Sequence, residues 1–166
     1  MSIEILFEDD RWAAAGLAQL AESACRETLT HLEFDPEIHE ISVLACDDAR
    51  IAILNAEFRD KPAPTNVLSW PAEDLAAEED GEAPLLPEPD FEGEPVELGD
   101  IAIAWETCAR EAREQGKAFN DHVTHLMVHG CLHLLGYDHI RPRDAARMEG
   151  IEVEILAKLG LADPYD

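Results

Sequence analysis

The sequence has no paired cysteines and no long apolar run, and each absence excludes a class of protein. Its four cysteines include no C-x-x-C pair, which argues against a zinc ribbon and against a disulfide framework. No apolar run approaches the roughly eighteen residues that cross a bilayer. The N-terminus lacks the basic region and apolar segment of a signal peptide. We therefore expect a cytoplasmic protein that makes no membrane contact.

Positive charge is also scarce, with 12 lysines and arginines against 37 acids and a formal charge of −25. Eleven of the acids lie between residues 72 and 97, a segment with four prolines and neither lysine nor arginine. We predict that this segment is a mobile, solvated loop inserted in the domain, without chemistry of its own. A negative field repels polyanions at long range, so a nucleic-acid substrate would need a locally positive cleft.

Hydrophobic periodicity and turn residues predict one α+β domain that spans residues 1–166. We expect strands at residues 3–8, 40–46, 66–70 and 98–104. We expect helices over about 12–32, 48–58, 105–116, 120–135 and 142–159, the fourth capped by Asn120 or Asp121. This order predicts one small mixed sheet of about four strands packed against about five helices.

The fourth helix carries the strongest chemical pattern. It is apolar in every direction except the one that carries histidines, so we expect it to be central and buried. His129 and His133 are four residues apart and share one helix face. Gly136 can end the helix, and His139 follows the chain reversal as a third nitrogen donor. Three imidazoles leave a tetrahedral Zn²⁺ one open position, which is typical of a hydrolytic centre.

Other residues near this pattern have more than one interpretation. His122 and His125 share the histidine face. The favoured interpretation is that they are hydrogen-bonded core or cleft histidines, and the alternative is that they contact a ligand or the substrate. Gly130 occupies the position where zincin proteases carry their glutamate base, so it argues against protease chemistry. Asp138 can orient a ligand imidazole or cap the turn.

The eleven residues from His129 to His139 read H-G-x-L-H-L-x-G-Y-D-H and resemble the signature of the YbeY family of single-domain bacterial endoribonucleases. Further segments agree with that family: residues 54–59 (LNAEFR), 64–69 (PTNVLS) and 98–101 (LGDI). The similarity extends over roughly residues 40–155, apart from the acidic segment. An eleven-residue pattern with three ligand positions is hard to meet by chance.

The resemblance implies single-strand-specific cleavage of ribosomal RNA, maturation of the 3′ end of small-subunit RNA, and ribosome quality control. It implies that His129, His133 and His139 hold one zinc ion and that Arg59 is catalytic. The implied partners are single-stranded ribosomal RNA and the ribosome or its small-subunit proteins, and not DNA. Asn66 departs from the commoner aspartate, so we do not expect that position to be the general base.

These residues suggest a division of labour at the site. The ion would polarise a scissile phosphate, and Arg59, on a loop made rigid by prolines, would stabilise charge on the phosphoryl oxygens. Lys61 and His125 are candidates for substrate binding. Candidates for a positive rim are Lys61, Arg141, Arg143 and Arg147.

Two other classes of function are compatible with the sequence. One is a ribosome-associated assembly factor whose zinc is mainly structural. The other is a metal-dependent hydrolase of peptides or small molecules, which the negative charge would suit.

Overall fold

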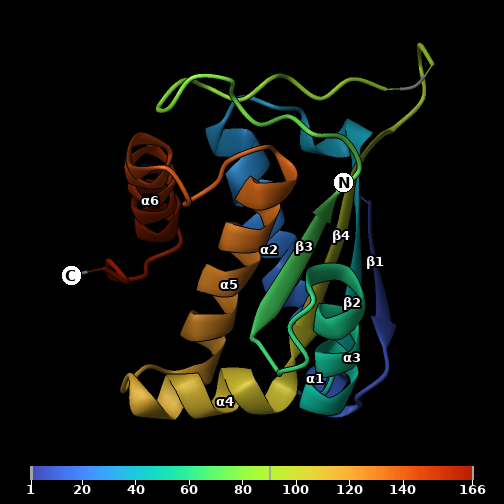
Figure 1. Cartoon of the computed structure of the whole chain (residues 1–166), viewed down its shortest axis with the longest axis vertical. Coiled ribbons are helices and arrows are strands. Elements are labelled where there is room, and N and C mark those ends of the chain that lie inside the picture. The colour runs from blue at the N-terminus through green and yellow to red at the C-terminus, as the bar shows by residue number, and fades with distance from the viewer. Residues whose placement is uncertain (1, 90, 166) are drawn as a thin grey trace.

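The computed structural model describes residues 2–89 and 91–165 and contains a mixed sheet with helices on both faces (Figure 1). Asp90, one of the acids of the 72–97 segment, lies outside the described residues. The strands are β1 Ser2–Phe7, β2 His39–Cys46, β3 Val67–Pro71 and β4 Val96–Ala104. The helices are α1 Arg11–Ala14, α2 Leu17–His31, the 3-10 helix η1 Pro36–Ile38, α3 Asp48–Arg59, α4 Trp105–Glu114, α5 Phe119–Leu134 and α6 Pro142–Lys158. The predicted α+β class with one small mixed sheet is confirmed.

The strands lie in the order β1-β2-β4-β3, in which β1, β2 and β4 are parallel and β3 runs antiparallel to β4. One face of the sheet packs with α2, α5 and α6 into the main core, whose buried side chains include Ile41, Ile101 and Leu132. On the other face α3 covers a smaller cluster that includes Ile51 and Leu68. Because β3 is an edge strand beside α5, the two elements form the walls of a cleft.

Helix α5 is central, as its all-round apolar pattern predicts. It packs against α2, α4, α6, β3 and β4, and ten of its residues are buried. Cys131, two residues after His129, is fully buried on the core side. Gly130 lies so close to the sheet that an added Cβ would come within 3.2 Å of the Ile101 side chain and 3.4 Å of Ser69 Oγ. The glycine between the histidines therefore allows α5 to approach the sheet closely.

The predicted single helix over residues 12–32 is wrong, because Gly16 divides it into α1 and α2. Gly16 has a φ of 80°, a left-handed conformation that glycine adopts without steric cost. The break turns α1 so that Trp12 is buried and donates from Nε1 to Cys46 O at 2.9 Å. Burial of a large indole thus outweighs the continuity of the helical pattern.

The predicted cap of α5 is also wrong. The helix begins at Phe119 with Ala118 as its N-cap, and Asn120 lies inside the first turn. The Phe119 ring packs against Trp12 and Trp105, with ring centroids 5.7 and 4.7 Å away. We attribute the earlier start to this aromatic contact, which the local capping pattern does not reveal.

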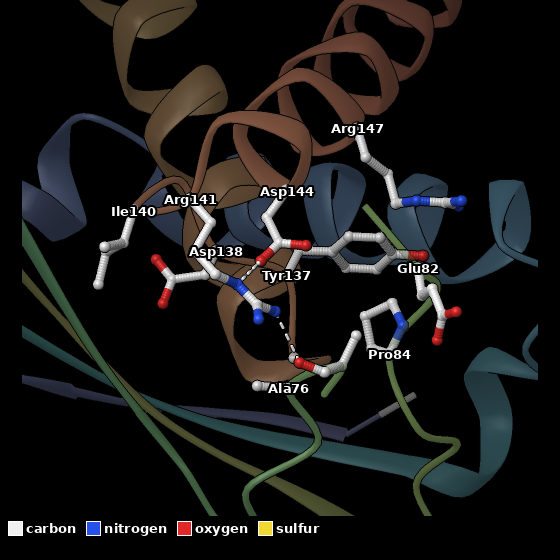
Figure 2. A pocket seen from close by; sticks show the side chains of 11 residues that line it. Ala76, Glu82, Pro84, Tyr137, Asp138, Ile140, Arg141, Asp144 and Arg147 are labelled. Atoms are coloured by element: carbon white, nitrogen blue, oxygen red, sulfur yellow. Dashed lines mark hydrogen bonds and ion pairs between the residues drawn. The ribbon is translucent and has the colours of Figure 1, made fainter. Parts of the chain in front are cut away.

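Part of the acidic segment is docked, contrary to the prediction of a mobile loop. Leu75 is 5% exposed, and its carbonyl accepts a hydrogen bond from Leu85 N at 2.8 Å. Figure 2 shows Arg141 between Asp144 and this segment. The Arg141 guanidinium donates to Ala77 O at 2.7 Å and to Glu78 O at 2.8 Å, besides its ion pair with Asp144.

Two further contacts fix the same stretch on the start of α6. Asp80 Oδ1 accepts from Asp144 N, and Asp144 Oδ1 accepts from Gly81 N, each at 2.8 Å. Arg147 Nε donates to Gly81 O at 2.8 Å. Residues 75–85 are therefore held against the start of α6 and are not a free loop. Beyond them the segment is more open, with Leu86 and Phe91 largely exposed.

In the part of the chain that the structure describes, no helix combines the length and apolarity needed to span a bilayer.

Candidate metal centre and cleft

The end of α5 brings three histidines together. Helical spacing places His129 and His133 on one face. Gly136, with a φ of 98°, then reverses the chain. Gly136 N donates to His133 O and Tyr137 N donates to Leu132 O, each at 3.0 Å, which is the hydrogen-bond pattern of a Schellman motif. This tight turn returns His139 to the histidine face.

The three imidazoles have the spacing that a shared cation needs. One nitrogen from each of His129, His133 and His139 lies within 4.8 Å of the other two. The Nε2 atoms of His129 and His133 are 3.0 Å apart. Around a tetrahedral ion with Zn–N bonds of about 2.0–2.1 Å, ligand nitrogens are about 3.3 Å apart. The α5 pair is therefore close to that spacing, and a nitrogen of His139 lies within 4.8 Å of both.

The low pKa of His133 also favours the binding of a cation at this site. Burial, followed by the neighbouring His129 and His139, lowers the pKa of His133 to about 4. Because a histidine binds metal through a neutral nitrogen, His133 needs to release no proton to the solvent at pH 7. The three imidazole donors and the neutral state of His133 therefore fit a divalent cation with a preference for nitrogen ligands.

A buried carboxylate that the sequence analysis missed lies behind these histidines. Glu152 of α6 is 0% exposed, and its Oε1 accepts from His129 Nδ1 at 2.6 Å. Burial alone raises the pKa of Glu152, but hydrogen bonds from His125, His129 and Tyr165 outweigh it and lower the pKa to about 2. A signal was present in the sequence, because Glu152 occupies an inward position between Met148 and Ile155 of α6.

The histidines line a cleft of about 900 Å³ between α5, β3 and the loop after α3. Arg59 and Lys61, both predicted as site residues, line it too, and so does Lys117, which was not predicted. The acids that line the cleft are Asp74, Glu111 and Asp138. Three basic and three acidic residues thus line the cleft, whereas acidic residues outnumber lysines and arginines threefold in the whole chain. The cleft is locally near neutral on a strongly negative protein.

Arg59 is the last residue of α3, rather than part of the proline loop as predicted. Asp60 follows in a left-handed conformation with a φ of 54° and turns the chain away. One guanidinium nitrogen, Nη2, donates to Ser69 O of the edge strand at 3.3 Å. Because a guanidinium has five N–H donors, most of them stay available to a ligand in the cleft.

Other histidines of the face have protein partners. His122 is buried and its Nε2 lies 3.0 Å from Glu111 Oε1, which also accepts from Asn66 Nδ2 at 3.0 Å. His125 lines the cleft, and its Nε2 lies 3.1 Å from Glu152 Oε2. His122 and His125 therefore each have a glutamate oxygen within hydrogen-bond distance.

Asp138 caps its own turn. Its Oδ1 accepts from His139 N at 2.7 Å and lies 3.9 Å from His139 Nδ1, too far for a hydrogen bond. Of the four residues considered for a positive rim, only Lys61 lines the cleft. Arg141 and Arg147 hold the docked acidic segment instead.

Comparison with known sequences gives close relatives over the full length. A family model described as Endoribonuclease YbeY matches residues 4–160. A protein named Endoribonuclease YbeY from Ruegeria pomeroyi is 62% identical over 165 residues, which cover 99% of this chain and 98% of that protein. A protein of the same name from Bartonella quintana is 44% identical over 166 residues, which cover 99% of this chain and 97% of the relative.

One solved structure has a related fold. A solution structure of a Thermotoga maritima protein matches with a TM-score of 0.55 and 21% identity, covering 99% of both chains. This likeness supports the fold alone.

Proposed function

The chain belongs to the YbeY family of endoribonucleases, and from that premise we propose that it is a metal-dependent endoribonuclease, a hydrolase of RNA phosphodiester bonds. The observation that carries the proposal is the convergence of three histidine nitrogens within 4.8 Å in a cleft that also contains Arg59. We further propose that residues 1–166 form one catalytic domain with an insertion at about residues 72–97. The match of the family model to residues 4–160 supports this.

His129, His133 and His139 are the proposed ligands of one divalent cation, and zinc suits a set of three imidazoles. When bound, the cation would supply a Lewis acid that polarises a scissile phosphate. The remaining work belongs to the chain. Arg59, held to the edge strand by one hydrogen bond, presents its free N–H groups to phosphoryl oxygens that gain negative charge.

Single-stranded ribosomal RNA is the proposed substrate, in maturation of the small-subunit RNA 3′ end and in ribosome quality control. Lys61 and His125, which line the cleft, are proposed to contact the strand, and Asp138 to hold the turn that carries His139. We propose the cytoplasm as compartment and the ribosome or its small-subunit proteins as partners. The four free, buried cysteines support a reducing compartment.

Two variants test the function. His133→Ala should lose both the bound metal and RNA cleavage. Arg59→Ala should keep the metal and lose about 10²-fold or more in turnover, because it removes a donor that stabilises developing charge. Lys158→Ala, at the end of α6, is the control. Metal analysis and cleavage of unstructured RNA, with casein in parallel, are the measurements. Undiminished cleavage by metal-free His133→Ala would refute the proposal, and hydrolysis of casein instead of RNA would redirect it to peptides.

A further inference from the structure

Glu152 is the one buried carboxylate among residues 2–89 and 91–165, and the proposed reaction does not use it. A carboxylate is rarely placed in a protein interior without partners, because removing its charge from water costs several kcal/mol. Glu152 is surrounded by the α5 histidines on one side and by Tyr165 of the C-terminal segment on the other. The arrangement calls for a role connected with those histidines.

Both oxygens of Glu152 are occupied. Oε1 accepts from His129 Nδ1 at 2.6 Å, and Oε2 lies 3.1 Å from His125 Nε2 and accepts a hydrogen bond from the Tyr165 hydroxyl. Burial, followed by this contact, raises the pKa of Tyr165, so the phenol stays protonated and donates. The Tyr165 ring also packs edge-on against His125, with ring centroids 5.7 Å apart. Tyr165 thus covers Glu152 on the side of the cleft.

The distances among His125, His129 and Glu152 favour hydrogen bonds between these side chains over a second bound cation. His125, His129 and Glu152 offer three ligand atoms within 4.8 Å. However, the 2.6 Å between His129 Nδ1 and Glu152 Oε1 is the length of a charge-assisted hydrogen bond. Two ligands of one tetrahedral zinc ion, each about 2.0–2.2 Å from it, would be about 3.3 Å apart. Glu152 therefore acts on His129 and does not share an ion with it.

The hydrogen bond determines which nitrogen of His129 faces the other histidines. With its Nδ1–H donated to Glu152, His129 keeps the lone pair of Nε2, the atom 3.0 Å from His133 Nε2. A carboxylate at the far nitrogen also makes the ring a stronger electron donor. In addition, the negative charge of Glu152 is offset more fully once a cation is held on the other side of the ring.

We propose that Glu152, covered by Tyr165, is a positioning residue that fixes the Nδ1–H tautomer of His129 and strengthens the binding of a divalent cation by the three histidines. The inference rests on the ligand set of the proposed function. It adds a residue of α6 and one of the C-terminal segment to the machinery of the site.

Glu152→Gln tests the proposal, because it keeps the shape and loses the charge. Chelator competition with Zn²⁺ alone should show a dissociation constant weakened about 10- to 100-fold. Tyr165→Phe, which removes one donor to Glu152, should weaken binding by a smaller factor. Glu154→Gln is the matched control, since Glu154 lies two residues away on the exposed side of α6, where it pairs with His31. The control should bind zinc like the unchanged chain.

A spectroscopic readout separates positioning from a general loss of structure. In the unchanged protein, ¹⁵N-edited proton NMR should show a strongly downfield His129 Nδ1–H, and Glu152→Gln should move it upfield. If Glu152→Gln fails to fold, two other measurements test the proposal. They are this resonance in the unchanged protein and the zinc affinity of Tyr165→Phe. Unchanged zinc affinity in folded Glu152→Gln, or a His129 protonated at Nε2 when zinc is bound, would overturn the proposal. A chain that binds zinc in a Glu152-dependent way yet cleaves no RNA would refute only the proposed function.

Discussion

At the scale of the residue, crowding and burial suit the three proposed ligand histidines to a cation. His129, His133 and His139 lie with ring centroids 4.5 to 5.2 Å apart, so a proton on one raises the cost of a proton on the next. In His133 burial adds to this repulsion, and together they lower its pKa to about 4. The same features that favour a metal therefore make the metal-free chain sensitive to acid.

This sensitivity gives a pH prediction for the metal-free protein. The pKa of His133 is about 4 in the folded chain and near 6.5 when unfolded, so between these values the unfolded chain binds more protons. The free energy of unfolding should fall as the pH drops through that window, with a contribution from His133 of up to about 1.4 kcal/mol per pH unit. Urea unfolding at pH 7, 5.5 and 4.5 measures it. His133→Gln should show a shallower slope, and equal slopes would contradict the prediction.

At the scale of the element, the turn between α5 and α6 determines where His139 lies. Gly136 combines a φ of 98° with close contact to the docked acidic segment, since an added Cβ would lie 2.7 Å from the backbone of Leu75. Arg141 and Asp144, at the start of α6, hold the same segment by hydrogen bonds. The segment that composition assigned to solvent thus supports the turn that delivers the third histidine.

Substitution of Gly136 tests this support. Gly136→Ala should destabilise the chain by about 2–4 kcal/mol, from the strained φ and from overpacking against Leu75. It should also weaken zinc binding, because His139 moves with the turn. Gly160→Ala is the control: Gly160 ends α6 with a φ of 79° but has open space around it, so only the backbone cost of about 1 kcal/mol applies. Denaturant unfolding and chelator competition measure both effects, and equal losses in the two variants would disprove the role of the contact.

At the scale of the whole molecule, the charge of −25 has to be reconciled with an RNA substrate. Arg59, Lys61 and Lys117 gather at the cleft, and among the described residues none of the three forms an ion pair. A bound divalent cation would add two further positive charges there. The long-range field then opposes approach, whereas the cleft favours a phosphate backbone once it is within a Debye length of about 8 Å at physiological salt.

The salt dependence of RNA binding tests this local charge. Lys61→Gln and Lys117→Gln should each weaken binding of a non-cleavable single-stranded RNA. Each should also reduce the slope of log K against log salt by about 0.7, the value for one lost phosphate contact on a single strand. Lys158→Gln, outside the cleft, should leave the slope unchanged. Fluorescence anisotropy between 50 and 200 mM salt gives the slopes. A common slope for all three variants would show that RNA does not follow the cleft.

Features that depend on short-range geometry could be predicted from the order of the residues. The α+β class follows from the period of the apolar residues. The approach of His129, His133 and His139 follows from one helical turn and one glycine-ended reversal. The pattern from His129 to His139 was also sufficient to indicate the family. These features can be predicted from local pattern, because each depends on the spacing of residues that lie close together in the sequence.

Contacts between distant segments were revealed by the folded chain alone. The fold placed Glu152 behind His129, Lys117 at the cleft and residues 75–85 against α6, and it broke the first helix at Gly16 to bury Trp12. Each of these contacts joins residues more than twenty positions apart, and its free energy comes from burial and hydrogen bonds that exist only once the helices pack on the sheet. The local sequence pattern does not indicate which distant residue each of these side chains will contact. The histidine triad was therefore readable in the sequence, whereas its support had to be found in the fold.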